Sequence, residues 1–234
     1  MNSLIVDEHN DLKEARQSFP VQHPIIKAIA IFFSYVFHPV FVPVYVLAFL
    51  LYGHPWVFAG YNDKSKLLVL AQGFMMLTFF PLVTVLLLKG LKFIESIFLK
   101  TQKDRIIPFI ACMTWYFWLW YVWNNMGKSN DSADMPREAV QFAFAIFVST
   151  ILGLMANILM KISLHAIAMG LFLCFIVLLG MEPGLKFGIY ISLALFITGL
   201  VCTSRFIVSD HTSKEVYGGL ALGIISMLAG YWVG

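Results

Sequence analysis

Long apolar stretches separated by short polar segments occupy most of the chain after residue 24. A helix needs about 17 to 25 largely apolar residues to cross a bilayer. Five stretches reach that length without interruption: residues 67–88, 107–123, 139–159, 185–201 and 217–233. Residues 166–179 form a shorter stretch, and residues 25–51 contain Pro39 and Pro43, which kink or break a helix. The pattern predicts an all-α, polytopic transmembrane helix bundle of about six to seven spans.

The ends of this pattern define the domains. Residues 1–24 are polar and of mixed charge, and we expect a partly helical tail at the membrane surface. Residues 25–234 are predicted to form a single transmembrane domain that starts with an interfacial helix and a short spanning piece. Residues 93–104 place Phe93, Ile94, Ile97 and Phe98 on one helical face, which predicts a further helix lying in the interface.

The composition agrees with a membrane protein. Hydrophobic residues make up 60% of the chain and charged residues 12%, whereas soluble domains are about 25% charged. The formal net charge of +3 is too small to indicate a nucleic-acid partner. Cys112, Cys174 and Cys202 all lie in apolar stretches without metal-ligand spacing, so we interpret them as small buried residues.

Three polar islands interrupt the apolar pattern, at residues 100–105, 161–165 and 204–215. Two predicted spans separate the first island from the second, and two more separate the second from the third. Because an even number of crossings returns the chain to the same face, all three islands are predicted to lie on one side, where they can converge. Ionisable groups at this depth are costly and mark functional sites.

The islands carry the groups that phosphoryl transfer uses. Arg and Lys neutralise phosphate oxygens, one His can attack phosphorus while another protonates the leaving alkoxide, and a carboxylate can fix a His tautomer. The candidates are Lys100, Lys103, Arg105, Ser163, His165, Arg205, His211 and Glu215. We interpret His38, beside Pro39, as a polar group hydrogen-bonded at the kink rather than as a catalytic residue.

The third island resembles a family signature. Ser204-Arg205, five residues, His211, three residues and Glu215 is similar to the third motif of the type 2 phosphatidic acid phosphatase (PAP2) superfamily, which has Asp at the last position. Ser163-Leu164-His165 resembles the second motif, Pro-Ser-Gly-His. Lys100, Arg105 and Pro108 form a looser version of the first, Lys, six residues, Arg-Pro. The resemblance covers about residues 100–223 and implies a PAP2-like core in a divergent bacterial membrane member.

The resemblance also implies roles for these positions. Arg105, together with Lys100 or Lys103, and Arg205 would bind phosphate, and Ser163 would hydrogen-bond a phosphate oxygen. His211 would be the nucleophile that forms a phosphohistidine, His165 the general acid, and Glu215 the residue that orients His211. The family needs no metal, and we expect no cofactor. The implied activity is hydrolysis of a phosphomonoester or diphosphate of a lipid.

Several alternatives remain open. Thr212 to Glu215 also read as a capping box at a helix start, so Glu215 caps, orients, or does both, and Lys100 or Lys103 alone suit an interfacial anchor. The departures at Ile107, Ile162, Leu164 and Glu215 favour a non-catalytic lipid-phosphate-binding or transport protein. A lipid phosphotransferase would use the same phosphohistidine.

The substrate and the location are expected only as classes. A site at the membrane boundary suits a phosphatidate, a phosphatidylglycerol phosphate or a polyprenyl phosphate, with membrane lipids as the other partners. We expect a multi-pass protein of the cell (inner) membrane. Lys and Arg do not determine the side, because their excess on the motif side disappears once the island residues are left out. The sequence leaves the oligomeric state open.

Overall fold

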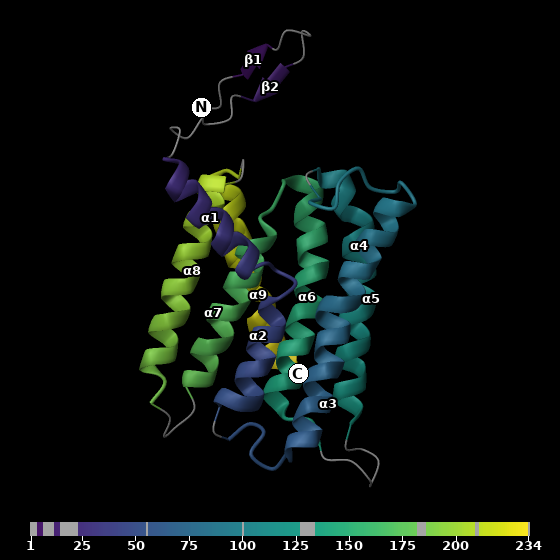
Figure 1. Cartoon of the computed structure of the whole chain (residues 1–234), viewed down its shortest axis with the longest axis vertical. Coiled ribbons are helices and arrows are strands. Elements are labelled where there is room, and N and C mark those ends of the chain that lie inside the picture. Colours follow the sequence, from purple (N-terminus) through teal and green to yellow (C-terminus); the bar gives the residue numbers. More distant parts are fainter. Residues whose placement is uncertain are drawn as a thin grey trace.

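The computed structural model describes residues 4–6, 12–14, 23–54, 56–99, 101–126, 134–181, 186–208 and 211–233. Its helices are α1 Pro24–Val36, α2 Val42–Ala48, α3 Asp63–Phe74, α4 Phe80–Gly90, α5 Gln102–Asn125, α6 Arg137–Leu159, α7 Leu164–Gly180, α8 Gly188–Val208 and α9 Ser213–Val233 (Figure 1). A π-helical turn, Phe49–Gly53, extends α2, and another, Met75–Phe79, joins α3 to α4.

Five helices are long and apolar enough to cross a membrane, which indicates a membrane protein. They are the continuous helix Asp63–Gly90, α5, α6, α8 and α9. Four of them contain one of the uninterrupted apolar stretches whole, and α8 begins at Gly188, within the stretch 185–201, so all five stretches are confirmed as long apolar helices. The apolar helices α1, α7 and α2 with its π-helical turn are shorter. In lipid only a helix satisfies every backbone group within one segment, which is why stretches of this length fold as helices.

The stretch at residues 25–51 breaks where its prolines predict. α1 ends at Val36 and α2 begins at Val42, with Pro39 between them and Pro43 in the first turn of α2. Proline is tolerated there because first-turn N–H groups have no intrahelical partner. Tyr45 Oη donates a hydrogen bond to the Val36 carbonyl (3.0 Å), which provides a partner for a backbone group at the break.

The expectation of a partly helical tail falls mostly on residues outside those that the structure describes, and the described residues 4–6 and 12–14 of the tail are extended. Leu4–Val6 (β1) and Leu12–Glu14 (β2) pair as antiparallel strands, with Leu4 opposite Glu14. Consecutive β-branched residues in β1 favour an extended backbone over a helix.

The predicted interfacial helix at residues 93–104 is wrong. The described residues before Gln102 form turns, with positive φ at Lys92 (62°) and Leu99 (48°). Asp104 Oδ1 accepts the Glu95 N–H (2.9 Å), so a long-range side-chain contact holds the turns in place of helical hydrogen bonds. α5 begins at Gln102, and Thr101 Oγ1 caps it by accepting the Asp104 N–H (3.1 Å).

Close packing of α7 on α9 brings the second and third islands together. A Cβ at Gly219 would lie 2.7 Å from the Ser163 carbonyl oxygen, and Gly170 and Gly223 pack directly on the backbone of the opposite helix. Small residues of this kind let membrane helices approach closely. The connections α4–α5, α6–α7 and α8–α9 all lie at one end of the bundle (Figure 1).

Candidate functional site

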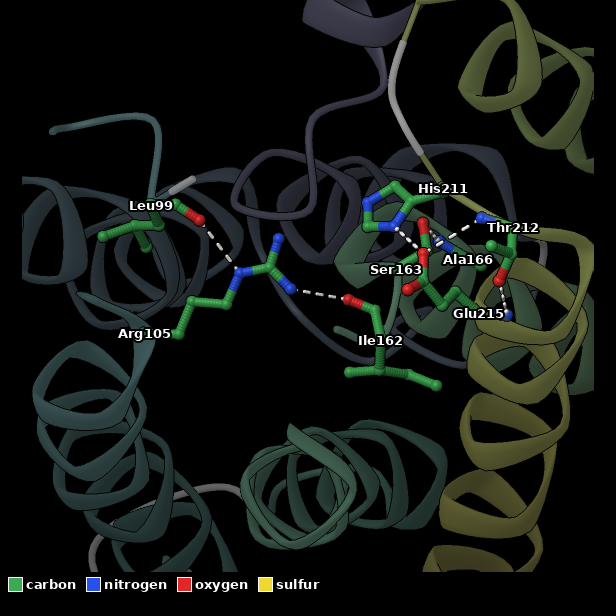
Figure 2. Close-up of polar contacts among 8 residues, drawn as sticks. All are labelled: Leu99, Arg105, Ile162, Ser163, Ala166, His211, Thr212 and Glu215. Atoms are coloured by element: carbon green, nitrogen blue, oxygen red, sulfur yellow. Dashed lines mark hydrogen bonds and ion pairs between the residues drawn. The ribbon is translucent and has the colours of Figure 1, made fainter. Parts of the chain in front are cut away.

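Hydrogen bonds join the three islands at this end of the bundle. Arg105 Nη1 donates to the Ile162 carbonyl (2.7 Å), which links the first island to the second. The next backbone group, the Ser163 N–H, donates to the Glu215 carbonyl (3.2 Å) and links the second to the third. In Figure 2 the Ile162–Ser163 segment lies between Arg105 and the His211–Glu215 pair. The prediction that the islands converge is confirmed, and their lying on one side of a membrane stays a prediction.

Arg105 is buried at the start of α5, with 6% of its surface exposed. Its Nε donates to the Leu99 carbonyl (2.9 Å), so two backbone carbonyls hold the guanidinium on two edges. A guanidinium has five N–H donors. Three therefore make no hydrogen bond to the described residues, and they can serve an anion. Two hydrogen bonds join the start of α5 to α6. Gln102 Nε2 donates to the Asn157 carbonyl (2.6 Å), and Asn157 Nδ2 donates to the Gln102 carbonyl (2.9 Å).

His211 and Glu215 form a buried pair at the start of α9. His211 is 4% exposed, and its Nδ1 lies 2.9 Å from Glu215 Oε2. The same oxygen accepts the Thr212 N–H (3.0 Å), while Thr212 Oγ1 accepts the Glu215 N–H (3.4 Å). One carboxylate therefore does both things that the sequence left open: it caps the helix and it orients the imidazole. With Nδ1–H donating to the carboxylate, Nε2 keeps the lone pair that a nucleophile needs.

The surroundings favour the neutral form of His211. Burial is the largest influence and lowers its pKa below the ordinary value of 6.5; the Glu215 carboxylate opposes this shift, and the charges of Arg205 and Arg105 add to it. Positive neighbours and burial both disfavour an imidazolium. The ring is therefore neutral near pH 7, as attack on phosphorus requires.

Ser163 is fully buried and caps α7. Its Oγ accepts the Ala166 N–H (3.5 Å), while its backbone N–H contacts Glu215. The contact of this hydroxyl with a phosphate oxygen stays a prediction. In this structure the Ser163 hydroxyl accepts its hydrogen bond from the first turn of α7.

A serine of α1 lies among the predicted residues. The Ser34 carbonyl accepts a hydrogen bond from His165 Nε2 (3.0 Å), and Ser34 Oγ lies 3.3 Å from Arg205 Nη1. The His38 ring packs edge-on against His165, with ring centroids 5.3 Å apart. Ser34 therefore contacts both His165 and Arg205, and His38 packs on His165, so these groups form one cluster.

Sequence reasoning missed Ser34 and assigned His38 a structural role. His38 Nδ1 does accept the Val40 N–H (3.4 Å) at the kink, as interpreted, but its ring also borders the candidate site. The signal for Ser34 was present, because it is the one hydroxyl among the apolar residues 28–34. Placing it required the fold, since α1 and α7 are distant in sequence.

The lysines of the first island are less defined. Lys103 is exposed, on the first turn of α5. Lys100 lies outside the described residues. Which lysine accompanies Arg105 therefore stays a prediction. In the described part of the chain, no three His, Cys, Asp or Glu side chains are grouped as metal ligands would be.

Comparisons with models of known protein families, with curated proteins and with solved structures found no match to this chain. The site is therefore interpreted from its own chemistry. Two buried or half-buried guanidinium groups, a neutral imidazole oriented by a carboxylate and a second imidazole converge at one end of an apolar bundle. This arrangement can bind an anion, attack it and protonate a leaving group.

Proposed function

We propose that the protein is an integral-membrane phosphatase that acts on lipid phosphates, in line with the resemblance of its islands to the PAP2 superfamily. The observation that carries the proposal is the His211–Glu215 pair (2.9 Å) in a cluster with Arg105, Arg205 and His165. A structural ion pair alone does not account for a nucleophile, an acid and two cations at one place. The end of an apolar bundle suits a substrate whose phosphate lies at headgroup level.

Phosphate binding is assigned to the two arginines. The Arg105 guanidinium is pre-oriented by two carbonyls and points toward the second island (Figure 2). Arg205 reaches the cluster from α8, and its charge acts on His211 and His165. Guanidinium groups suit the equatorial oxygens of a transferring phosphoryl group, on which negative charge is spread in the transition state.

The chemical step uses both histidines. His211 Nε2 donates its lone pair to phosphorus, the N–P bond forms, and the P–O bond to the lipid breaks. The leaving oxygen takes a proton from His165 in its imidazolium form, which the negative charge of the bound phosphate favours, and His165 becomes neutral. Water then attacks the phosphohistidine and gives its proton to His165, and inorganic phosphate leaves with His211 neutral again. Glu215 stabilises the positive charge that develops on His211 during attack.

The substrate has to replace one contact of this structure. His165 Nε2 donates to the Ser34 carbonyl, which therefore lies where the leaving oxygen would accept the proton. A shift of the C-terminal turn of α1 would free His165. His38, whose ring packs edge-on against that of His165, would keep it in place.

The test is phosphate release by purified protein from phosphatidate, phosphatidylglycerol phosphate and polyprenyl phosphate in detergent micelles. His211→Ala and His165→Ala are each expected to lower kcat by at least about 10³-fold. His54→Asn is the matched control, because His54 lies at the far end of α2, outside the site, where its Nδ1 accepts two backbone N–H groups. Activity that persists in His211→Ala would refute the nucleophile.

A non-catalytic lipid-phosphate-binding protein is the second candidate, and two contacts favour it. Ser163 Oγ is used to cap α7, and His165 Nε2 is used by Ser34. This candidate predicts that the protein binds the same lipids and releases no phosphate from any of them. Equal binding by wild type and His211→Ala, with no turnover by either, would support it over the phosphatase.

A further inference from the structure

An apolar groove runs between α1 and α8, beside the polar cluster. Its volume is about 480 Å³, within the range of about 300–1,000 Å³ usual for ligand sites. Ile29 and Phe33 line it from α1, and Phe196, Gly199 and Ile207 line it from α8. From Leu195 to Ile207 it follows roughly 18 Å of helix, at 1.5 Å per residue.

The groove adjoins the proposed phosphate site directly. Ser204 lines it and is followed by Arg205, and Phe33 lines it and is followed by Ser34. The Arg205–Ser34 hydrogen bond (3.3 Å) joins α8 to α1 at these two positions. A molecule lying in the groove therefore has one end beside a guanidinium and its remaining length along apolar side chains.

We propose that this groove holds a hydrocarbon chain of the lipid phosphate whose headgroup Arg205 binds. The identity of the headgroup rests on the proposed function. The lining residues carry no charge, whereas the adjoining cluster carries Arg205 and Arg105, so the groove is complementary to an amphiphile with an anionic end. The groove faces outward from the bundle, where Ile29 and Phe196 are exposed, so a chain can enter it from the bilayer.

Gly199 offers a way to fill the groove without disturbing the fold. It is exposed on α8, and a Cβ there would meet nothing within 4 Å. Gly188 is also exposed on α8, its Cβ would meet nothing within 4 Å, and it lies outside the groove. Gly199→Phe and Gly188→Phe are therefore a matched pair.

The first experiment measures phosphate release from a long-chain prenyl phosphate, from a long-chain phosphatidate and from p-nitrophenyl phosphate, which has no chain. Gly199→Phe is expected to raise KM for at least one long-chain substrate by about tenfold or more and to leave p-nitrophenyl phosphate unchanged. Gly188→Phe is expected to leave KM unchanged for all three substrates. The long-chain substrate that is affected identifies the kind of chain. The proposal would be overturned if Gly199→Phe raised KM equally for all three substrates, or if it raised KM for none of them.

The second experiment does not depend on turnover. A long-chain alkyl phosphate that carries a photoreactive group at its chain end is cross-linked to wild-type protein, and the labelled residues are mapped by mass spectrometry. Three results together would support binding of the chain in the groove even if no phosphate were released. The labels lie on α1 and α8, excess long-chain alkyl phosphate displaces them while the matching alcohol does not, and Gly199→Phe abolishes them. Labels elsewhere, displacement by the alcohol, or a label joining two copies of the chain would refute it.

Discussion

At the scale of single residues, Glu215 shows how one side chain can serve the fold and the site together. Its Oε2 accepts from the backbone of Thr212 and lies 2.9 Å from His211 Nδ1. The longer reach of Glu compared with Asp suits this double contact, because the carboxylate has to return from the first turn of α9 to the residues before it. Glu at this position is thus compatible with the orienting role proposed for it.

The pH dependence of activity follows from His211. Burial lowers the pKa of His211 below 6.5, so the ring is half protonated only at a pH below 6.5. Activity that needs the neutral ring should therefore show an acid limb whose midpoint lies below pH 6.5, in a profile of kcat/KM against pH. An acid limb centred well above pH 6.5 would contradict this assignment.

Replacing Glu215 should move that limb in a defined direction. The carboxylate raises the pKa of His211 through its hydrogen bond and its charge, so Glu215→Gln should lower that pKa further and shift the acid limb to lower pH. kcat should fall by about 10²- to 10⁴-fold, because the charge developing on His211 loses its partner. Thr212→Ala is the control: it should cost about 1 kcal/mol of stability through the lost cap and leave the acid limb in place.

At the scale of elements, the α7–α9 contact positions the second island against the third. Gly219 lies over the Ser163 carbonyl, and the Ser163 N–H contacts Glu215. The spacing of these helices therefore determines whether His211 and His165 share a site. Interhelical spacing in a bilayer is set by side-chain size more than by burial of apolar area, since the lipid is as apolar as the helices.

Neighbouring glycines of α9 provide a test. A Cβ at Gly219 would lie 2.7 Å from the Ser163 carbonyl oxygen, whereas a Cβ at Gly218 would meet only Ile162 Cδ1, at 3.3 Å. Gly219→Ala should lower the free energy of unfolding by about 1–3 kcal/mol, as overpacking does. Gly218→Ala should change it by less than about 1 kcal/mol. Thermal unfolding of both variants in the same detergent measures the difference, and equal stability would contradict the packing.

At the scale of the whole molecule, two helices lie between each pair of successive islands, and this even number brings residues that are about 60 and 50 positions apart to one end of the bundle. Asp63–Gly90 is long enough to cross a membrane. Lys64 is exposed at its start, and Lys103 and Lys214 are exposed at the end of the bundle that holds the islands. This arrangement makes a prediction about sidedness that does not depend on the proposed chemistry.

Single cysteines introduced at these lysines should report the sides. In a variant whose three native cysteines are replaced by alanine, Lys103→Cys and Lys214→Cys should react with a membrane-impermeant thiol reagent from the same face of sealed vesicles. Lys64→Cys should react only from the opposite face. Reaction of Lys64→Cys and Lys103→Cys from one face would mean that Asp63–Gly90 does not cross.

The sequence by itself determined the long helices, the break at Pro39 and the convergence of the islands. These depend on local properties: the length of an apolar run, the missing N–H of proline, and the parity of crossings. Only the tertiary structure decided three further points: that Asp104 holds residues before α5 in turns, that Ser163 faces its own helix, and that Ser34 and His38 border His165. Some of these points are contacts between segments that are distant in sequence and close in space. The others are choices among hydrogen-bond partners, and the packing of the helices determines which partners are within reach. The periodicity of one segment contains no information about such partners.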